Sequence, residues 1–192
     1  MRGAALHHHR AGIAVIGLLL LGCGENRFIA QVRRPPALPM SEPLPDLTVV
    51  VDGTETRLVD LLGPRGTLLN FWATWCVPCR REAQDLATAH RRWAGRGLRA
   101  VGVEVSGVPE EEAQAWAARW GADYVNATGL DMRTLKSLWG ANGIPLTLVI
   151  DGAGIVRLAL FGAHDLDGLD RAIRRTILTN TTEGPRHVLA VR

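Results

Sequence analysis

The chain has 192 residues, of which 47% are hydrophobic and 21% are charged, a composition that excludes a disordered chain and fits one globular domain with appendages. Its formal charge of +3 includes Arg2 and Arg10, so the rest is close to neutral. This argues against nucleic-acid binding, which needs clustered basic side chains on phosphates. Three cysteines are too few for a framework of several disulfides.

The N-terminal segment has the layout of an export signal. Two arginines accompany an unbroken apolar run at 11–22, which is shorter than the roughly 20 residues of a membrane-spanning helix. The end of this run, Leu20-Leu21-Gly22-Cys23, resembles a bacterial lipobox, whose cysteine becomes the lipidated first residue after cleavage. We therefore predict a signal or lipoprotein segment at 1–22 and lipidation of Cys23. An uncleaved membrane anchor and simple secretion remain as alternatives.

Prolines dominate the segment that follows, at 23–45. Such a density favours an extended, semi-rigid tether. The prolines of this segment are Pro35, Pro36, Pro39, Pro43 and Pro45. We expect one folded domain at 46–178 and a loose C-terminal tail at 179–192.

Apolar runs bounded by turn residues predict the strands of the folded domain. The first two form an expected N-terminal hairpin that turns at Asp52-Gly53. In chain order, the predicted strands are 47–51, 56–62, 67–72, 98–105, 124–125, 146–150 and 155–161.

Apolar residues at helical spacing predict four helices. The first starts near Cys76 and ends at Gly95, and the second follows Pro109 and ends at Gly121. A short third helix is expected at 131–139, and Asp165 or Asp167 is expected to cap the last one. The alternation of strands and helices, followed by a late hairpin, predicts an α/β protein with a mixed central sheet flanked by helices on both faces.

Two of the cysteines, Cys76 and Cys79, follow a buried strand and open a helix. The thiolate is the form that attacks a disulfide, and a helix N-terminus stabilises negative charge. We therefore expect Cys76 to be the exposed nucleophile and Cys79, almost one turn further on, to be the buried resolving cysteine. Pro78 suits the first turn of a helix, where its missing N–H costs no hydrogen bond.

Two other interpretations of this cysteine pair are weaker. A structural zinc site needs four ligands, and the chain has no second C-x-x-C, while its other histidines outside the N-terminus are scattered. A purely structural disulfide would close only a tiny loop and would stabilise little. The pattern therefore favours a redox pair without a metal.

Two sequence stretches carry a specific resemblance. The run 71–82, FWATWCVPCRRE, resembles the active-site stretch of the thioredoxin superfamily in its TlpA-like, membrane-tethered branch. The run 143–147, GIPLT, resembles the second signature of that family, a cis-proline that faces the redox pair. The resemblance covers residues 45–178. It implies a thioredoxin fold with an N-terminal β-hairpin and a central αβ insertion between Cys79 and Pro145.

The resemblance also implies an activity and a site. Members of this branch carry out extracytoplasmic thiol reduction, often in cytochrome c or copper-site maturation. It implies that Pro145 acts with the cysteines and that a substrate groove runs along four residues around them, Trp75, Val77, Pro78 and Ile144. No cofactor is implied.

Glu82 is the candidate for proton handling. The buried acid of small thioredoxins has no counterpart here, and Asn70 stands in its place. Glu82 lies three residues after Cys79, a spacing that makes helical side chains neighbours. A partly buried carboxylate can accept a thiol proton. The alternative is a surface acid paired with an arginine.

We therefore predict a periplasmic, membrane-tethered protein-disulfide reductase that uses Cys76 and Cys79. Its expected partners are exported proteins with disulfides, a membrane thiol–disulfide electron donor and the membrane itself through the N-terminus. We expect no nucleic acid as a partner and a monomeric state. A disulfide oxidase or isomerase, and a non-enzymatic Cu(I) carrier, are the alternative functions, because potentials vary widely within this motif and soft thiolates bind Cu(I).

Overall fold

The computed structural model describes residues 37–178 of the chain. The predicted export segment at 1–22, the lipidation site Cys23 and the predicted tail at 179–192 lie outside this range. In the part that the structure describes, no helix has the length and apolar character needed to cross a membrane.

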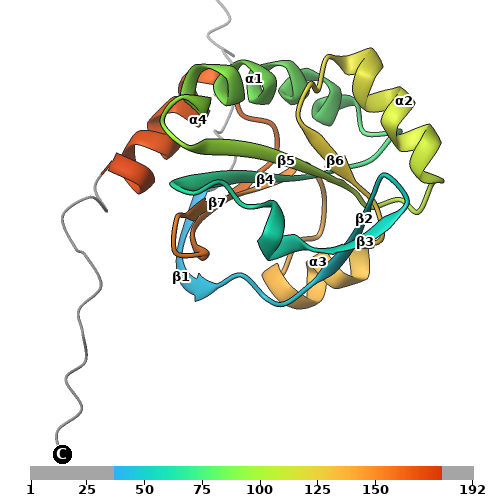
Figure 1. Ribbon diagram of the computed structural model, residues 1–192, viewed down its shortest axis with the longest axis horizontal. Coiled ribbons are helices and arrows are strands. Elements are labelled where there is room, and N and C mark those ends of the chain that lie inside the picture. The colour runs from blue at the N-terminus through green and yellow to red at the C-terminus, as the bar shows by residue number, and fades with distance from the viewer. Residues whose placement is uncertain (1–36, 179–192) are drawn as a thin grey trace, which may run out of the picture. The chain divides into compact units, whose positions relative to one another are not determined.

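Eight strands and four α-helices make up the described part of the chain (Figure 1). The strands are β1 (Ala37–Pro43), β2 (Thr48–Val51), β3 (Thr54–Arg57), β4 (Gly66–Trp72), β5 (Leu98–Glu104), β6 (Val125–Ala127), β7 (Leu146–Asp151) and β8 (Ile155–Phe161). The helices are α1 (Val77–Ala94), α2 (Glu110–Trp120), α3 (Met132–Trp139) and α4 (Leu166–Ile173), with a 3₁₀ turn η1 (Leu58–Leu61) and a π-helical turn η2 (Arg174–Leu178).

The central sheet has six strands in the order β1-β8-β7-β4-β5-β6. β4 pairs in parallel with β5 and antiparallel with β7, so the sheet is mixed, as predicted. Parallel neighbours need a crossover connection, and α1 and α2 supply the crossovers from β4 to β5 and from β5 to β6. Every residue of β4 is buried, which places the strand before the cysteine pair in the middle of the core.

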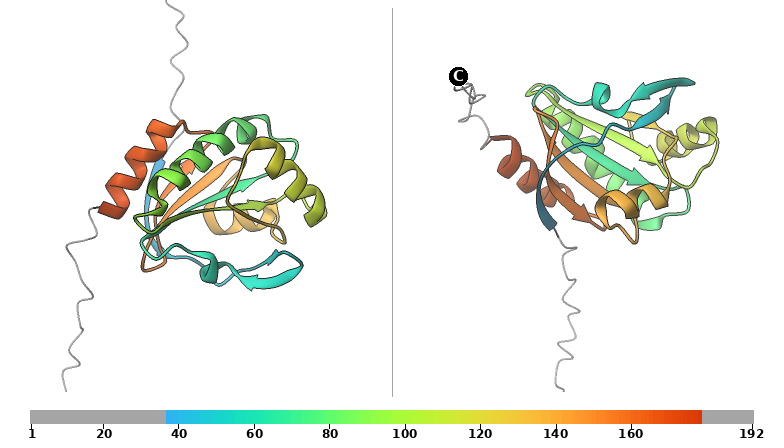
Figure 2. Two further views of the ribbon diagram at one scale, coloured as in Figure 1. Left: turned by 45° about the horizontal axis from the view of Figure 1, so that its top comes forward. Right: turned by 90° about the horizontal axis from the view of Figure 1, so that it is seen from below.

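Helices cover both faces of this sheet (Figures 1 and 2). Side chains of a strand alternate between its two faces, and β4 shows this at its centre. Leu68 packs with Leu86 of α1 and Leu169 of α4, whereas the next residue, Leu69, packs in a cluster with Leu135 of α3 and with the β2–β3 hairpin. The predicted fold class is confirmed.

Helix ends follow from capping chemistry. The side chain of Asp165 accepts a hydrogen bond from the Gly168 N–H at 2.8 Å, so Asp165, rather than Asp167, caps α4. Gly121 has a φ of 75° and ends α2, as the sequence predicts. At α1 the N-cap is Cys76, whose sulfur accepts from the Cys79 N–H at 3.3 Å.

Two predictions about the start of the domain are wrong. Residues 37–43 were expected in the tether, but they form β1, which pairs with β8 at the edge of the sheet. An edge strand tolerates proline because one side of it donates no ladder hydrogen bonds. The return strand predicted at 56–62 ends at Arg57 and gives way to the 3₁₀ turn η1, which carries the fully buried Leu58 into the core.

Candidate active site

Cys76 and Cys79 form a disulfide at the start of α1, directly after the loop that leaves β4. The two Cα atoms are 5.3 Å apart. Cys76 sits at the N-cap, where the Cys79 N–H points at its sulfur. When the disulfide is reduced, this N–H and the helix dipole favour a thiolate on Cys76.

The structure buries both cysteines. Only 3% of Cys76 and 2% of Cys79 are exposed, so the predicted exposure of Cys76 is wrong for the disulfide form. Cys76 lies in an apolar cluster with Trp72 and Ala73, against which Ile144 packs. The residues that flank it protrude instead, with 65% of Trp75 and 66% of Val77 exposed. Two exposed apolar side chains thus flank the buried Cys76 in the sequence.

A cis peptide bond faces the disulfide. The bond between Ile144 and Pro145 is cis, which confirms the prediction. The carbonyl oxygen of Ile144 lies 3.7 Å from Cys76 Sγ. The carbonyl of Pro145 accepts a hydrogen bond from the Gly162 N–H at 2.8 Å, which ties this turn to the end of β8. The backbone before β7 thus contacts the redox pair directly.

Glu82 is buried beneath the disulfide end of α1, with 1% of it exposed. Its Oε2 accepts from Asn70 Nδ2 of β4 at 2.9 Å. Its Oε1 accepts from the His164 N–H at 3.1 Å and from Thr147 Oγ1 of β7 at 3.4 Å. This burial excludes the alternative of a surface acid.

Burial raises the pKa of Glu82 to about 8, because a carboxylate in an apolar interior loses its hydration. The hydrogen bonds from His164, Asn70 and Thr147 act in the opposite direction, and the nearby charge of Asp85 adds a smaller increase. Glu82 can therefore both hold and release a proton near neutral pH.

Comparison with known proteins agrees with this geometry. Residues 40–159 match the AhpC/TSA family. The chain belongs to the AhpC/TSA family. It is 32% identical to the thiol:disulfide interchange protein HelX of Rhodobacter capsulatus, over 78% of this chain and 85% of that protein. It is 28% identical to the thiol-disulfide oxidoreductase ResA of Geobacillus thermodenitrificans, over 77% of this chain and 84% of that protein.

A solved structure supports the same assignment. The thiol:disulfide interchange protein of Chlorobium tepidum, a thioredoxin family protein, superposes with a TM-score of 0.57 and is 27% identical, covering 74% of this chain and 99% of that one. The fold is therefore the thioredoxin fold, and this AhpC/TSA family member is a thiol–disulfide oxidoreductase of the TlpA-like branch.

The structure brings most of the predicted site residues of this oxidoreductase to one place. Cys76, Cys79 and Ile144 share one apolar cluster, and Pro145 adjoins it. Pro78 lies in the first turn of α1, as predicted. Cys23 lies outside the described residues.

Sequence reasoning missed the partners of Glu82. Thr147 stands opposite Asn70 in the antiparallel pairing of β4 with β7, so both side chains point to the face that α1 covers. The Asn70 amide donates to Thr147 Oγ1 at 2.9 Å. Only the strand register shows this, and a register of distant strands is not readable from one sequence. His164 contributes its backbone N–H, for which residue type gives no signal.

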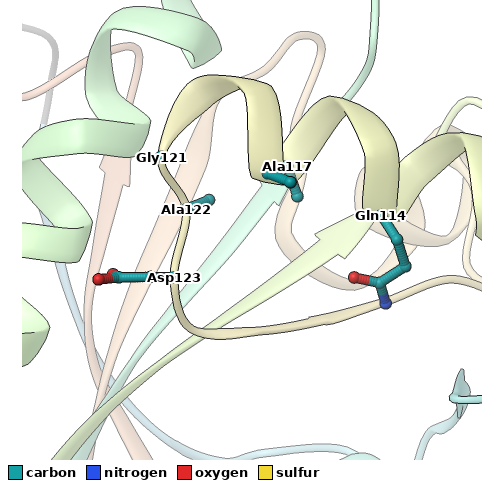
Figure 3. A pocket seen from close by; sticks show the side chains of 6 residues that line it. Gln114, Ala117, Gly121, Ala122 and Asp123 are labelled. Atoms are coloured by element: carbon teal, nitrogen blue, oxygen red, sulfur yellow. The ribbon is translucent and has the colours of Figure 1, made fainter.

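The structure also has a hollow at the end of α2 (Figure 3). Its volume is about 340 Å³, and small side chains dominate its lining. The polar groups there already have partners, since Gln114 donates to the Asn126 carbonyl and Asp123 pairs with Arg91. The lining residues are Gln114, Ala117, Ala118, Gly121, Ala122 and Asp123. None of them is a predicted site residue.

The burial of Glu82 predicts a pH-dependent stability of the disulfide form. Its pKa is higher in the folded protein than in the unfolded chain, so the protonated carboxyl stabilises the fold. That contribution is complete below the unfolded value of 4.5 and is lost as the pH rises through about 8. We expect urea unfolding to show a free energy of unfolding that declines by roughly a few kcal/mol over this range.

The matched variants for this measurement are Glu82→Gln and Glu55→Gln, the second of which changes an exposed glutamate of β3. The decline should vanish in Glu82→Gln and persist in Glu55→Gln. Above about pH 7 the histidines are largely neutral in both states, so this part of the range isolates Glu82. Parallel curves for all three proteins would contradict the prediction.

Proposed function

We propose that this oxidoreductase is an extracytoplasmic, membrane-tethered reductase of disulfides in exported proteins, such as factors of cytochrome c or copper-site maturation. The observation that carries the proposal is the redox pair at the N-terminus of α1, with the Ile144 carbonyl on one side and a buried carboxylate on the same helix. The names of its relatives, thiol:disulfide interchange protein and thiol-disulfide oxidoreductase, support the reaction class.

The first step is attack on the client. The Cys76 thiolate attacks one sulfur of the client disulfide, a mixed disulfide forms, and the other client sulfur leaves as a thiolate. The helix N-terminus stabilises the attacking sulfur. The reduced form must move Cys76 into reach of the client, because in the disulfide form it is buried.

The second step resolves the mixed disulfide. Cys79 gives its proton to Glu82 and attacks Cys76 Sγ, so the Cys76–Cys79 bond forms and the second client sulfur leaves as a thiolate. Two electrons have then passed from the protein to the client. A membrane thiol–disulfide donor returns two electrons to the pair, and no cofactor takes part.

A groove for the client is proposed around the pair. Trp75 and Val77 are exposed, and Pro78 and Ile144 are partly exposed. These apolar surfaces suit an unfolded client segment, which exposes apolar side chains that a folded protein buries. The backbone of Ile144, at the turn before β7, offers polar groups for strand-like pairing.

We propose that the protein is anchored through Cys23, with residues 23–36 as the start of a tether and the monomer as the working form. The lipobox-like Leu20-Leu21-Gly22-Cys23 supports lipidation. Mass spectrometry of the native protein should find Cys23 as the lipidated N-terminus, whereas an intact Met1 would favour an uncleaved anchor.

The roles of the two cysteines can be separated by labelling and trapping. In the reduced protein, iodoacetamide should modify Cys76 much faster than Cys79 near neutral pH, because the helix N-terminus favours the Cys76 thiolate. Cys79→Ser should accumulate mixed disulfides with client proteins, and Cys76→Ser, its matched control, should not. Faster labelling of Cys79 would reverse the assignment.

The direction of the reaction is set by the redox potential. We expect a potential below about −200 mV, on the reducing side of protein disulfide isomerase at about −180 mV. The Val77-Pro78 dipeptide between the cysteines resembles reducing members of the superfamily. Equilibration of the protein with glutathione buffers gives this value, and a potential near −120 mV would identify an oxidase instead.

Glu82→Gln tests the proton acceptor. The substitution keeps the shape of the side chain but removes its basicity. We expect resolution of the mixed disulfide to slow by about 10²-fold or more, the usual contribution of a general base, while the first attack stays nearly unchanged. Rapid mixing of reduced protein with a chromogenic aromatic disulfide separates the two steps, since only the attack depends on reagent concentration. An unchanged rate of the second step would show that Glu82 does not take the proton of Cys79.

A further inference from the structure

Three side chains form a closed ring of hydrogen bonds in the core. The Asn70 amide has two hydrogens, and it donates one to Glu82 Oε2 and one to Thr147 Oγ1. Because the Thr147 oxygen accepts from Asn70, its own hydrogen is available for Glu82 Oε1, which lies 3.4 Å away. The directions of all three hydrogen bonds are thereby determined.

The two carboxylate oxygens of Glu82 differ in the number of hydrogen bonds that they accept. Each oxygen has two acceptor positions. On Oε1 both are taken, by the His164 N–H and by Thr147. On Oε2 Asn70 is the one donor among the described residues. A proton that arrives at Glu82 therefore finds its free position on Oε2.

We propose that Thr147 is a positioning residue for the redox reaction, whose hydroxyl occupies Oε1 of Glu82 and so reserves Oε2 for the proton of Cys79. This inference rests on the proton-acceptor role in the proposed function. Thr147 is fully buried, and its place on β7 is set by the pairing with β4, so its hydroxyl has little freedom to turn away. Without it, the carboxylate would lose a donor that stabilises its charged form.

Other ionisable groups near Glu82 do not replace this donor. Asp85 on α1 has a raised pKa, caused by its own desolvation and by Asp165, and its charge opposes ionisation of Glu82. Desolvation raises the pKa of Tyr124, before β6, and keeps its side chain neutral. Desolvation lowers the pKa of the His164 imidazole, and His164 donates to the carboxylate through its backbone N–H.

The test follows the second step of the reaction of the reduced full-length protein with dithiobis(nitrobenzoate) across a range of pH. The rate of this step should rise with the ionisation of Glu82. Thr147→Val keeps the side-chain shape but removes the donor, so the midpoint of the rise should move up by about one pH unit, the size expected for one hydrogen bond to a charged group. At neutral pH this corresponds to a roughly tenfold slower second step.

Two controls separate positioning from general damage. Thr147→Ser keeps the hydroxyl and should restore the wild-type midpoint. Thr67→Val removes another fully buried threonine hydroxyl, one that accepts from the Gly63 N–H at 2.9 Å on β4, and should leave the midpoint unchanged. A Thr147→Val protein that is slower at every pH with an unmoved midpoint would overturn the inference, because only packing would then have changed.

Failure of the proposed function gives a different result. If Glu82→Gln leaves the second step unchanged, the proton-acceptor role fails, and the inference about Thr147 fails with it. If Glu82→Gln abolishes the pH-dependent rise while Thr147→Val keeps the wild-type midpoint, only the inference about Thr147 fails. The probe is not a client protein, so the direction of the physiological reaction does not affect these outcomes.

Discussion

The carboxyl group of Glu82 imposes a constraint on the elements around it. A polar group in the core costs free energy unless hydrogen bonds compensate for its lost hydration, and an ionised one costs more. Glu82 meets this requirement with donors from β4, from β7 and from the loop between β8 and α4. The helix that begins at the redox pair is thereby held against the sheet at a defined position.

Features that depend on local sequence patterns were predictable, whereas those that depend on contacts between distant segments were not. The fully buried β4 and the start of α1 at the cysteine pair follow from local patterns, namely an apolar run and a proline in the first turn. The cis-proline turn before β7 was expected from the family resemblance of residues 143–147. β1 was missed because proline density in a single sequence does not distinguish a tether from an edge strand. The roles of Thr147 and of the His164 backbone depend on contacts between distant segments, which only the fold defines.

The burial of Cys76 shows another limit of sequence reasoning. Its place at the N-cap was predictable, but its exposure depends on Ile144, which is 68 residues away in the chain and packs on the same apolar cluster. Its neighbours Trp75 and Val77 are the exposed side chains instead. The disulfide form thus presents apolar surface rather than sulfur.

The segment that begins at Ile144 contacts both the redox pair and the buried carboxyl group of Glu82. The Ile144 carbonyl contacts Cys76, and three residues later Thr147 donates to Glu82. Because side chains alternate along an extended strand, one short segment can contact both groups. Its first residue, Ile144, lies at Cys76, and Thr147 points to the face that α1 covers, toward Glu82. A client that pairs with the backbone of Ile144, as proposed, would therefore contact the same segment that carries Thr147. In the proposed mechanism, the attacking sulfur and the buried proton acceptor are thus both contacted by one short segment, residues 144–147.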